Sequence, residues 1–256
     1  MTPVTDSTPL PPLSLNAWLR WDLVERLLPA PDPSLRVLEV GCGQGGFGAR
    51  LAQRYTYLGV DADAPAVEVA QQRVSLVSPT ARVVAGDVAE VVPPDPVYDL
   101  VCAFEVLEHI EDDAAALRTW TERLRPGGML LLSTPADASR LGPWDEIVGH
   151  YRRYDLDGLA EDLLAVGLVD VRVTGFGAPL GYLLETGRNA VARRRQSTAA
   201  GRSMAERTGS SGRTLQPSRR AAGVAMQVAS LPFRRVQRLF PRTGTGLVAG
   251  AVKPPA

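Results

Sequence analysis

Two carboxylates and two imidazoles are the side chains of this sequence whose types and spacing best suit chemistry. Glu105, Glu108 and His109 stand at positions i, i+3 and i+4, so a helical turn would place all three on one face. The other histidine of the chain, His150, is expected to follow a strand of the same sheet. Carboxylates and imidazoles together can hold a divalent cation, so these residues form a candidate metal site.

The same histidines also suit a reaction that needs no metal. Imidazole titrates near neutral pH, so His109 or His150 could act as a general base. A plainer interpretation is that Glu108 and His109 make local hydrogen bonds and line a pocket. Each of these interpretations places the segment at the wall of a substrate pocket.

A glycine-rich segment predicts a second site, for a ligand that approaches the backbone closely. The apolar run 37–40 ends in four glycines within residues 41–46, which is typical of a strand that turns into a helix. Glycine has no Cβ, so it permits positive φ and leaves room for a bound molecule. Another apolar run ends in Asp61, 20 residues after Gly41, where a carboxylate can accept hydrogen bonds from ribose hydroxyls.

The glycine spacing alone does not name the ligand. Gly41, Gly43 and Gly46 satisfy the dinucleotide pattern G-x-G-x-x-G, whereas Gly45 in place of Gly46 gives G-x-G-x-G. Glu39 places a negative charge two residues before the first glycine, where it would repel a pyrophosphate and tolerate an ammonium or a sulfonium. The surroundings of the turn therefore favour a cationic ligand.

With these motifs the chain resembles the class I S-adenosylmethionine-dependent methyltransferases of the type 11/12-like group, over roughly residues 35–176. The resemblance rests on the ordered motifs Glu39–Gly45, Asp61, Ala85–Asp87, Tyr98–Val101 and Arg125–Gly128. It implies that Glu39 and the glycine backbone face the methionine part of the cofactor, Asp61 the ribose and Asp87 the adenine amino group. Either aspartate could instead cap a helix or a turn. The cofactor-binding residues implied in this way are Glu39, Gly41, Cys42, Gly43, Gly45, Asp61, Ala62, Asp87, Val88, Phe104 and Glu105.

The segment Glu105–His109 is also similar to the E-x-x-E-H motif of metal-dependent O-methyltransferases, namely the small-RNA 2′-O-methylating enzymes and the ubiquinone-pathway enzymes. This similarity implies that Glu105, Glu108, His109 and His150 bind Mg²⁺ or Mn²⁺. The cation would then lower the pKa of an acceptor hydroxyl. Related methyltransferases carry a similar segment without a metal, so both interpretations stay open.

The elements that must position these residues follow from alternating apolar and amphipathic runs, which indicate a doubly wound, mostly parallel α/β sheet. The resembled fold has seven strands, the last antiparallel beside the sixth. An amphipathic helix is expected over Asn16–Leu28, with Trp18, Trp21 and Leu28 available to cover the cofactor side. The expected strands are Arg36–Val40, Tyr57–Val60, Arg82–Ala85, Asp99–Phe104, Met129–Ser133, Val169–Thr174 and Thr245–Val252.

Composition fits a protein with one main domain. The chain has 256 residues, 45% of them hydrophobic, which is enough to bury a full core. We expect a disordered N-terminus over residues 1–12, a methyltransferase core over 13–176, a basic helical and mobile insertion over 177–243, and a final strand and tail over 244–256. Two cysteines give no disulfide framework, and no secretory signal or membrane-spanning apolar run is evident, so we expect a cytoplasmic protein.

The net charge of zero hides an uneven distribution. Residues 186–256 hold 13 arginines and Lys253 against the single acid Glu206. Residues 196–218 are too poor in apolar side chains to pack, so we expect them to be mobile. The flanking segments 179–185 and 221–240 join apolar residues to arginines.

Three uses of this insertion remain open. It could be a helical lid over the substrate pocket, or a basic amphipathic surface that contacts the inner face of a membrane and suits a lipid-linked acceptor. Nucleic acid is a third candidate partner, through phosphate neutralisation. Few aromatic residues lie among the arginines and no recognised RNA module is present, so nucleic acid is disfavoured.

The residues after His150 are expected near the acceptor as well. Tyr151, Arg152, Arg153 and Tyr154 could recognise an anionic or aromatic substrate. Alternatively they form a plain loop before a helix over 156–166 that Asp155 caps.

The sequence thus predicts an S-adenosylmethionine-dependent methyltransferase that acts on a small-molecule or lipid-like acceptor, at oxygen. A nicotinamide-dependent oxidoreductase is one alternative, disfavoured by Glu39, by Asp87 and by the lack of an obvious catalytic Tyr-Lys pair. A methyltransferase-like protein that binds the cofactor without turnover is the other.

Overall fold

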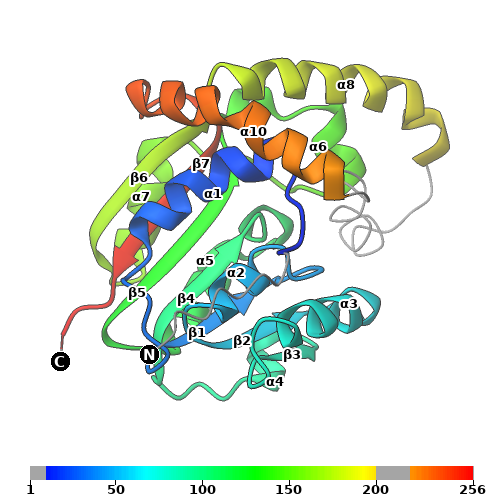
Figure 1. Ribbon diagram of the computed structural model, residues 1–256. Helices are drawn as coiled ribbons and strands as arrows, with labels where there is room; N and C mark the ends of the chain where they lie inside the picture. The colour runs from blue at the N-terminus through cyan, green and yellow to red at the C-terminus, as the bar shows by residue number, and fades with distance from the viewer. Residues whose placement is uncertain (1–9, 200–219, 256) are drawn as a thin grey trace.

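The computed structural model describes residues 10–199 and 220–255, with side chains described over 10–194 and 223–255. Its centre is a seven-stranded sheet in the order β3-β2-β1-β4-β5-β7-β6 (Figure 1). Strand β7 runs antiparallel to both of its neighbours, and the other pairs are parallel. The strands are β1 Arg36–Val40, β2 Thr56–Asp61, β3 Arg82–Ala85, β4 Tyr98–Phe104, β5 Leu124–Pro135, β6 Val169–Gly177 and β7 Gly244–Val252.

The helices cover both faces of this sheet. One face carries α1, α2 and α3, with α10 against α1, and the other carries α4, α5 and α7. The α-helices are α1 Leu15–Leu27, α2 Gly48–Ala52, α3 Ala64–Ser75, α4 Val88–Val91, α5 Asp113–Glu122, α6 Pro143–Val148, α7 Leu156–Ala165, α8 Leu180–Ala199 and α10 Arg220–Val236. Three short 3₁₀ helices are η1 Leu107–His109, η2 Ala138–Arg140 and η3 Gln237–Leu239.

The central strands are apolar because the sheet buries them on both faces. Along β1, Val37 joins the core under α1 and α2, whereas Leu38 and Val40 join the core under α4 and α5. Strands that are buried on both faces have continuous apolar runs in their sequence. The expected strands are all present, and the predicted mostly parallel seven-stranded sheet is confirmed.

The first helix begins one residue earlier than predicted. Ser14 caps α1 by accepting a hydrogen bond from the Ala17 amide at 3.3 Å. Trp18 and Trp21 are buried in the core, where the Trp21 ring packs edge-on against Phe47 at 4.8 Å between centroids. Their large apolar surfaces therefore pack in the core between α1 and the sheet.

The predicted insertion contains α8 and α10, which lie between β6 and β7 in sequence. Helix α10 runs alongside α1 (Figure 1), and Asp22 of α1 pairs with Arg234 and Arg238 after it. The Gln237 side chain ties the two together, since its Nε2 donates to the Leu19 carbonyl at 2.9 Å. Of the stretch 196–218, residues 196–199 belong to α8, and residues 200–218 lie outside the described residues, as do residues 1–9.

The topology has one switch point, between β1 and β4. The chain proceeds from β1 outward to β3, then crosses back and proceeds from β4 toward the other edge. Ligands of open α/β sheets bind in the crevice at the carboxyl ends of the strands at such a point. In the described part of the chain, no helix has both the length and the apolarity needed to cross a bilayer.

Candidate active site

The glycine turn after β1 opens onto this crevice. Gly41, Gly43 and Gly45 have φ values of +66°, +52° and +73°, which side chains rarely adopt. A Cβ on Gly41 would lie 2.3 Å from Cγ2 of Val106, which follows β4. The turn and the segment after β4 are therefore in close contact. A Cβ on Gly43 would meet nothing within 4 Å, so that position faces open space.

Asp61, at the end of β2, is bonded to the glycine turn. Its Oδ2 accepts from the Gly43 amide at 2.7 Å, and Oδ1 accepts from the Asp63 amide at 2.9 Å. The carboxylate thus holds the turn in place at the position where the resemblance puts a ribose. Ala62 directly follows it, at the same edge of the sheet.

Glu39 is buried beneath the turn, with 3% of its surface exposed. Its Oε2 accepts a hydrogen bond from the Tyr57 hydroxyl at 2.6 Å. Burial raises the pKa of Glu39 to about 8; the hydrogen bond from Tyr57 opposes this shift and the nearby charge of Asp61 adds to it. A positive charge on a bound ligand would favour the ionised form of this carboxyl group.

Four further predicted cofactor residues lie around the same edge. Asp87 caps α4, since Oδ1 accepts from the Ala89 amide at 2.7 Å, so the alternative capping role is present here. Cys42 and Val88 are buried. The Phe104 ring at the end of β4 packs edge-on against Phe47, with centroids 5.0 Å apart.

Glu105 pairs with Arg20 of α1 and is not part of the group formed by the other candidate metal ligands. Its φ of 58° is unusual for a residue with a side chain. Its Oε1 lies 2.9 Å from Nη1 of Arg20 and accepts from the Ser133 hydroxyl at 3.1 Å. Burial alone would raise the pKa of Glu105, but the charges of Arg20 and His150 and the bond from Ser133 together lower it.

Glu108, His109 and His150 do come together. Potential ligand atoms of the three residues lie within 4.8 Å of one another, and the two imidazole rings meet edge-on at 4.7 Å between centroids. The predicted helical turn is the 3₁₀ helix η1, which holds Glu108 and His109. The structure therefore groups three of the four candidate ligands, and the fourth, Glu105, pairs with Arg20.

Glu108 is fully buried, and neither of its carboxylate oxygens accepts a hydrogen bond from another described residue. The nearest cationic candidate is His150, whose Nε2 is 3.9 Å from Oε1. Burial, and then the charge of Glu105, raise the pKa of Glu108 well above its usual range. A buried carboxyl group without a partner is a costly feature for a fold to keep.

Both histidines are oriented through Nδ1. Nδ1 of His109 is 3.1 Å from the Gly149 carbonyl, and Nδ1 of His150 is 2.7 Å from Oδ1 of Asp145. Burial and the charge of His150 lower the pKa of His109 to about 4, so its ring is neutral at neutral pH. The prediction that His150 follows a strand was wrong: it follows helix α6, which an αL residue, Gly149, ends.

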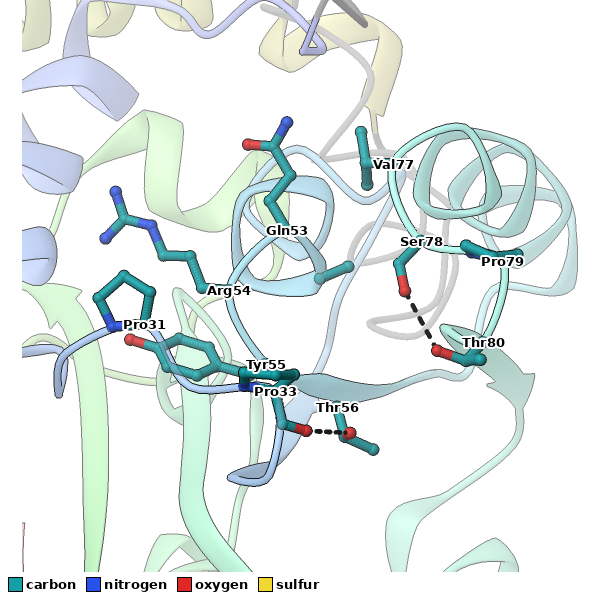
Figure 2. A pocket seen from close by; sticks show the side chains of 11 residues that line it. Pro31, Pro33, Gln53, Arg54, Tyr55, Thr56, Val77, Ser78, Pro79 and Thr80 are labelled. Carbon is teal, nitrogen blue, oxygen red and sulfur yellow. Dashed lines mark hydrogen bonds between the residues drawn. The ribbon is translucent and has the colours of Figure 1, made fainter. Parts of the chain in front are cut away.

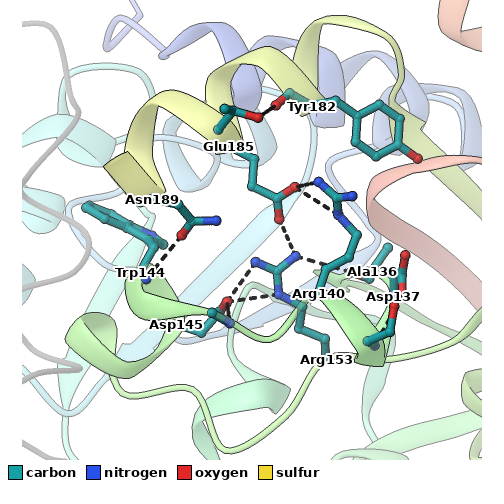
Figure 3. A network of polar contacts seen from close by, with 12 residues as sticks. Ala136, Asp137, Arg140, Trp144, Asp145, Arg153, Tyr182, Glu185 and Asn189 are labelled. Carbon is teal, nitrogen blue, oxygen red and sulfur yellow. Dashed lines mark hydrogen bonds and ion pairs between the residues drawn. The ribbon is translucent and has the colours of Figure 1, made fainter. Parts of the chain in front are cut away.

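The loop 151–154 is used mainly inside the protein. Arg152 pairs with Asp113 and the Tyr154 hydroxyl donates to the same carboxylate at 2.8 Å. Arg153 is buried between Asp145 and Glu185 (Figure 3). These contacts favour the plain-loop interpretation.

Asp155 differs from the expected helix cap. It stands before α7, but its side chain makes no capping hydrogen bond. Instead Oδ1 accepts from the Ala138 amide at 3.3 Å, which ties the loop to η2.

Two site residues were not predicted. Arg20 and Ser133 contact Glu105 from α1 and β5, across long sequence separations that no local pattern reveals. A hollow lined by Pro31, Tyr55 and Thr80 (Figure 2) lies at the opposite edge of the sheet, where the chain enters β2. It is remote from the switch point and is not part of the candidate site.

Known proteins match this arrangement. Residues 16–173, more than half of the chain, match the family model of a methyltransferase domain. A probable S-adenosylmethionine-dependent methyltransferase of Mycobacterium tuberculosis is 33% identical over 178 residues, which cover 67% of this chain and 63% of that relative. The chain thus spans less than two thirds of that relative. A ubiquinone biosynthesis O-methyltransferase of Pseudomonas syringae pv. syringae is 38% identical over 103 residues, 39% of this chain and 44% of that protein.

Solved structures agree on the fold. Phosphoethanolamine N-methyltransferase 2 of Haemonchus contortus has a TM-score of 0.59 at 20% identity, covering 92% of this chain and 52% of that one. The YcgJ protein of Bacillus subtilis has a TM-score of 0.59 at 16% identity, covering 94% and 99%. The motifs, the topology and the family match together favour a methyltransferase over a nicotinamide-dependent oxidoreductase. The chain belongs to the methyltransferase-domain family of class I S-adenosylmethionine-dependent methyltransferases.

Proposed function

We propose that the chain transfers the methyl group of S-adenosylmethionine to a hydroxyl oxygen of a small-molecule acceptor. The main support is the contact between Gly41 and Val106 at the switch point, which joins the glycine turn to the segment carrying Glu108 and His109. The donor would lie on the turn and the acceptor on the histidine side. The sulfonium is already activated, so alignment of the two supplies most of the rate enhancement.

The three grouped residues fit a divalent cation. Glu108 offers a buried carboxyl group that accepts no hydrogen bond from the described residues, and His109 and His150 are each oriented through Nδ1, as is usual for metal-binding histidines. Mg²⁺ or Mn²⁺ bound there would lower the pKa of the acceptor hydroxyl. We assign the metal to Glu108, His109 and His150; Glu105 remains with Arg20 in this arrangement.

The metal assignment has a direct test. A chelator, or the substitution Glu108→Gln, should abolish turnover and leave S-adenosylmethionine binding unchanged. Glu111→Gln removes an exposed carboxyl two residues beyond His109 and should leave turnover unchanged. Turnover that survives both chelation and His150→Ala would rule out the metal.

A metal-free mechanism would use the same histidines. Asp145 orients His150, and His109 is neutral at neutral pH because burial lowers its pKa to about 4. The His150 ring could take the acceptor proton, whereas the lowered pKa of His109 makes its ring a weak base. Turnover that resists chelation but is lost in His150→Ala would assign this role to His150.

The chemistry of the acceptor atom is tested by product analysis. Incubation with S-adenosylmethionine and acceptors that carry both a hydroxyl and an amine should yield S-adenosylhomocysteine and the O-methyl product, identified by mass spectrometry of fragments. A product methylated only at nitrogen would contradict the assignment to oxygen.

The outer side of α10 supports peripheral contact with a membrane and a lipid-like acceptor. Val224, Val228 and Leu231 are 60%, 59% and 48% exposed and stand at helical spacing, with Arg235 exposed beyond them. No carboxylate occurs in the described residues 186–194 and 223–255. An apolar stripe flanked by arginines suits an anionic bilayer.

Vesicle co-sedimentation tests this contact. Val228→Glu with Leu231→Glu should abolish sedimentation with phosphatidylglycerol vesicles, whereas Leu76→Glu, on an exposed apolar residue of the distant α3–β3 connection, should not. Equal sedimentation of all variants would contradict membrane contact through α10.

A further inference from the structure

Arg188 of α8 is a partly buried cationic group that the reaction described above does not use. Its Nε is buried without a hydrogen-bond partner, and no described residue forms an ion pair or a hydrogen bond with its guanidinium. Its guanidinium lies over the ring of Trp144 of α6, whose centroid is 5.5 Å from Cζ. Burial lowers the pKa of Arg188, and the charges of Glu105, Glu185 and Asp145 oppose this shift only in part.

Arg188 lies on the face of α8 that packs against α6, the helix that precedes His150. Glu185, Arg188 and Asn189 stand at i, i+3 and i+4, on the helix face that meets α6. Glu185 binds Arg140 and Arg153, and Asn189 accepts from the Trp144 amide at 3.2 Å (Figure 3). The two neighbours of Arg188 on this face therefore have hydrogen-bond or ion-pair partners, whereas Arg188 has none among the described residues.

Two of the acids whose charges act on Arg188 belong to the candidate active site. Glu105 is the acid that acts most strongly on Arg188, and Asp145, which holds His150, also acts on it. Both acids already have closer cationic partners, since Glu105 pairs with Arg20 and Asp145 pairs with Arg153. Arg188 is thus a cation near the candidate active site whose hydrogen-bonding capacity is left for a ligand.

We infer that Arg188, backed by the Trp144 ring, binds an anionic group of the acceptor, a carboxylate or a phosphate, and so selects acceptors that carry one. The planar guanidinium can donate two parallel hydrogen bonds to either group. The ring contact limits how the guanidinium can rotate, which favours one orientation of the acceptor. This inference rests on the proposed function, because it concerns the acceptor of the same reaction.

Simple probes test the inference with the full chain saturated with S-adenosylhomocysteine. The affinities of 4-hydroxybenzoate and phenyl phosphate are measured by calorimetry and compared with that of neutral phenol. At least one anion should bind about ten- to a hundredfold more tightly than phenol. The anion that binds more tightly identifies the group recognised.

Substitutions then assign the preference to one side chain. Arg188→Gln should bind the anions no more tightly than phenol, whereas Arg193→Gln, on an exposed arginine of the same helix, should keep the wild-type preference. Arg188→Gln removes the contact with the Trp144 ring but no hydrogen bond made within the described protein, so its melting temperature should fall only slightly and its affinity for S-adenosylmethionine should not fall. If Arg188→Gln does not fold, Arg188→Lys decides: a several-fold weaker preference supports the inference, and an unchanged one overturns it.

Two failures are distinguishable. A wild-type protein that binds S-adenosylmethionine but shows no preference for the anions, or a preference that Arg188→Gln retains, overturns only this inference. A wild-type protein that does not bind S-adenosylmethionine overturns the proposed function as well.

Discussion

The ionisation of Glu39 depends both on its burial and on the charge of the ligand. It lies under the glycine turn and accepts a hydrogen bond from Tyr57, and burial raises its pKa to about 8. At neutral pH most of this carboxyl group is therefore neutral. A sulfonium bound on the turn would stabilise the ionised form, so binding of the donor would release a proton.

The raised pKa of Glu39 has a consequence for stability. Between pH 4.5 and about 8 the folded protein holds a proton that the unfolded chain releases, so the free energy of unfolding falls as pH rises. Glu39→Gln keeps an acceptor for Tyr57 and removes this titration. Its stability relative to wild type should rise through that window, by up to about 1.4 kcal/mol per pH unit.

Urea unfolding across the pH range measures this difference. Glu90→Gln, which removes an exposed carboxyl of α4, is the control. Parallel stability curves for wild type and Glu39→Gln would contradict the assigned titration.

The sequence predicted the place of some site residues and not of others. The glycines and Asp61 were predictable because their roles depend on neighbours in the same turn. The spacing predicted that Glu108 and His109 lie together, whereas His150 was placed beside them on the wrong expectation that it follows a strand, and Glu105 pairs with Arg20 instead. Arg188 could not be distinguished from the other arginines of the insertion, because its lack of a partner is a property of the packed structure.

At the scale of elements, a buried ion-pair network joins the site to the insertion. Arg153 lies between Asp145 of α6 and Glu185 of α8, and all three side chains are at most 2% exposed (Figure 3). Because Asp145 also holds His150, the packing of α8 and the orientation of the histidine depend on the same contacts.

Removal of Arg153 should therefore destabilise the fold strongly. Arg153→Met leaves two buried carboxylates without their shared cation, at a cost of about 3–5 kcal/mol. The neighbouring Arg152→Met breaks a more exposed pair with Asp113 and should cost about 1 kcal/mol or less. Equal losses for the two variants in urea unfolding would show that the network does not carry this stability.

Strand β7, which follows the insertion in sequence, packs closely against β6. A Cβ on Gly244 would lie 2.0 Å from the carbonyl oxygen of Phe176 in β6, so the two backbones approach too closely for a side chain. At Gly250 of the same strand, the nearest atom would be 3.6 Å away. Gly244→Ala should cost at least about 2 kcal/mol, and Gly250→Ala about 1 kcal/mol or less.

Thermal unfolding of the two β7 variants checks this expectation. A melting temperature of Gly244→Ala equal to that of Gly250→Ala would mean that β6 and β7 can move apart without cost.

The elements themselves were largely predictable. Strand β1 was predicted with its observed bounds, because a strand buried on both faces is an uninterrupted apolar run. The place of β7 came from the resemblance to a known fold, since no local pattern sets the order of strands in a sheet. Helix α6 was missed because its six residues are too few to show a helical period.

At the scale of the whole molecule, the switch point between β1 and β4 brings two separate stretches of chain to one crevice. One stretch holds the glycine turn and the other holds Glu108 and His109, which His150 joins from the end of α6. The insertion adds α8 beside α6 and α10 beside α1. Donor, acceptor and partner surfaces would thus occupy neighbouring parts of one fold.

The central claim is that S-adenosylmethionine binds on the glycine turn, and a matched pair of glycines isolates that site. Gly43 and Gly127 have φ values of +52° and +75°, and a Cβ on either would meet nothing within 4 Å. Alanine should therefore strain the backbone similarly at both positions. At Gly43 alone it would also occupy the space of the donor.

Calorimetric titration of S-adenosylmethionine and of NAD into wild type, Gly43→Ala and Gly127→Ala tests the claim most directly. We predict that wild type and Gly127→Ala bind S-adenosylmethionine with equal affinity, that Gly43→Ala binds it at least about tenfold more weakly, and that NAD does not bind. A wild-type protein that does not bind S-adenosylmethionine, or that binds NAD more tightly, would contradict the account.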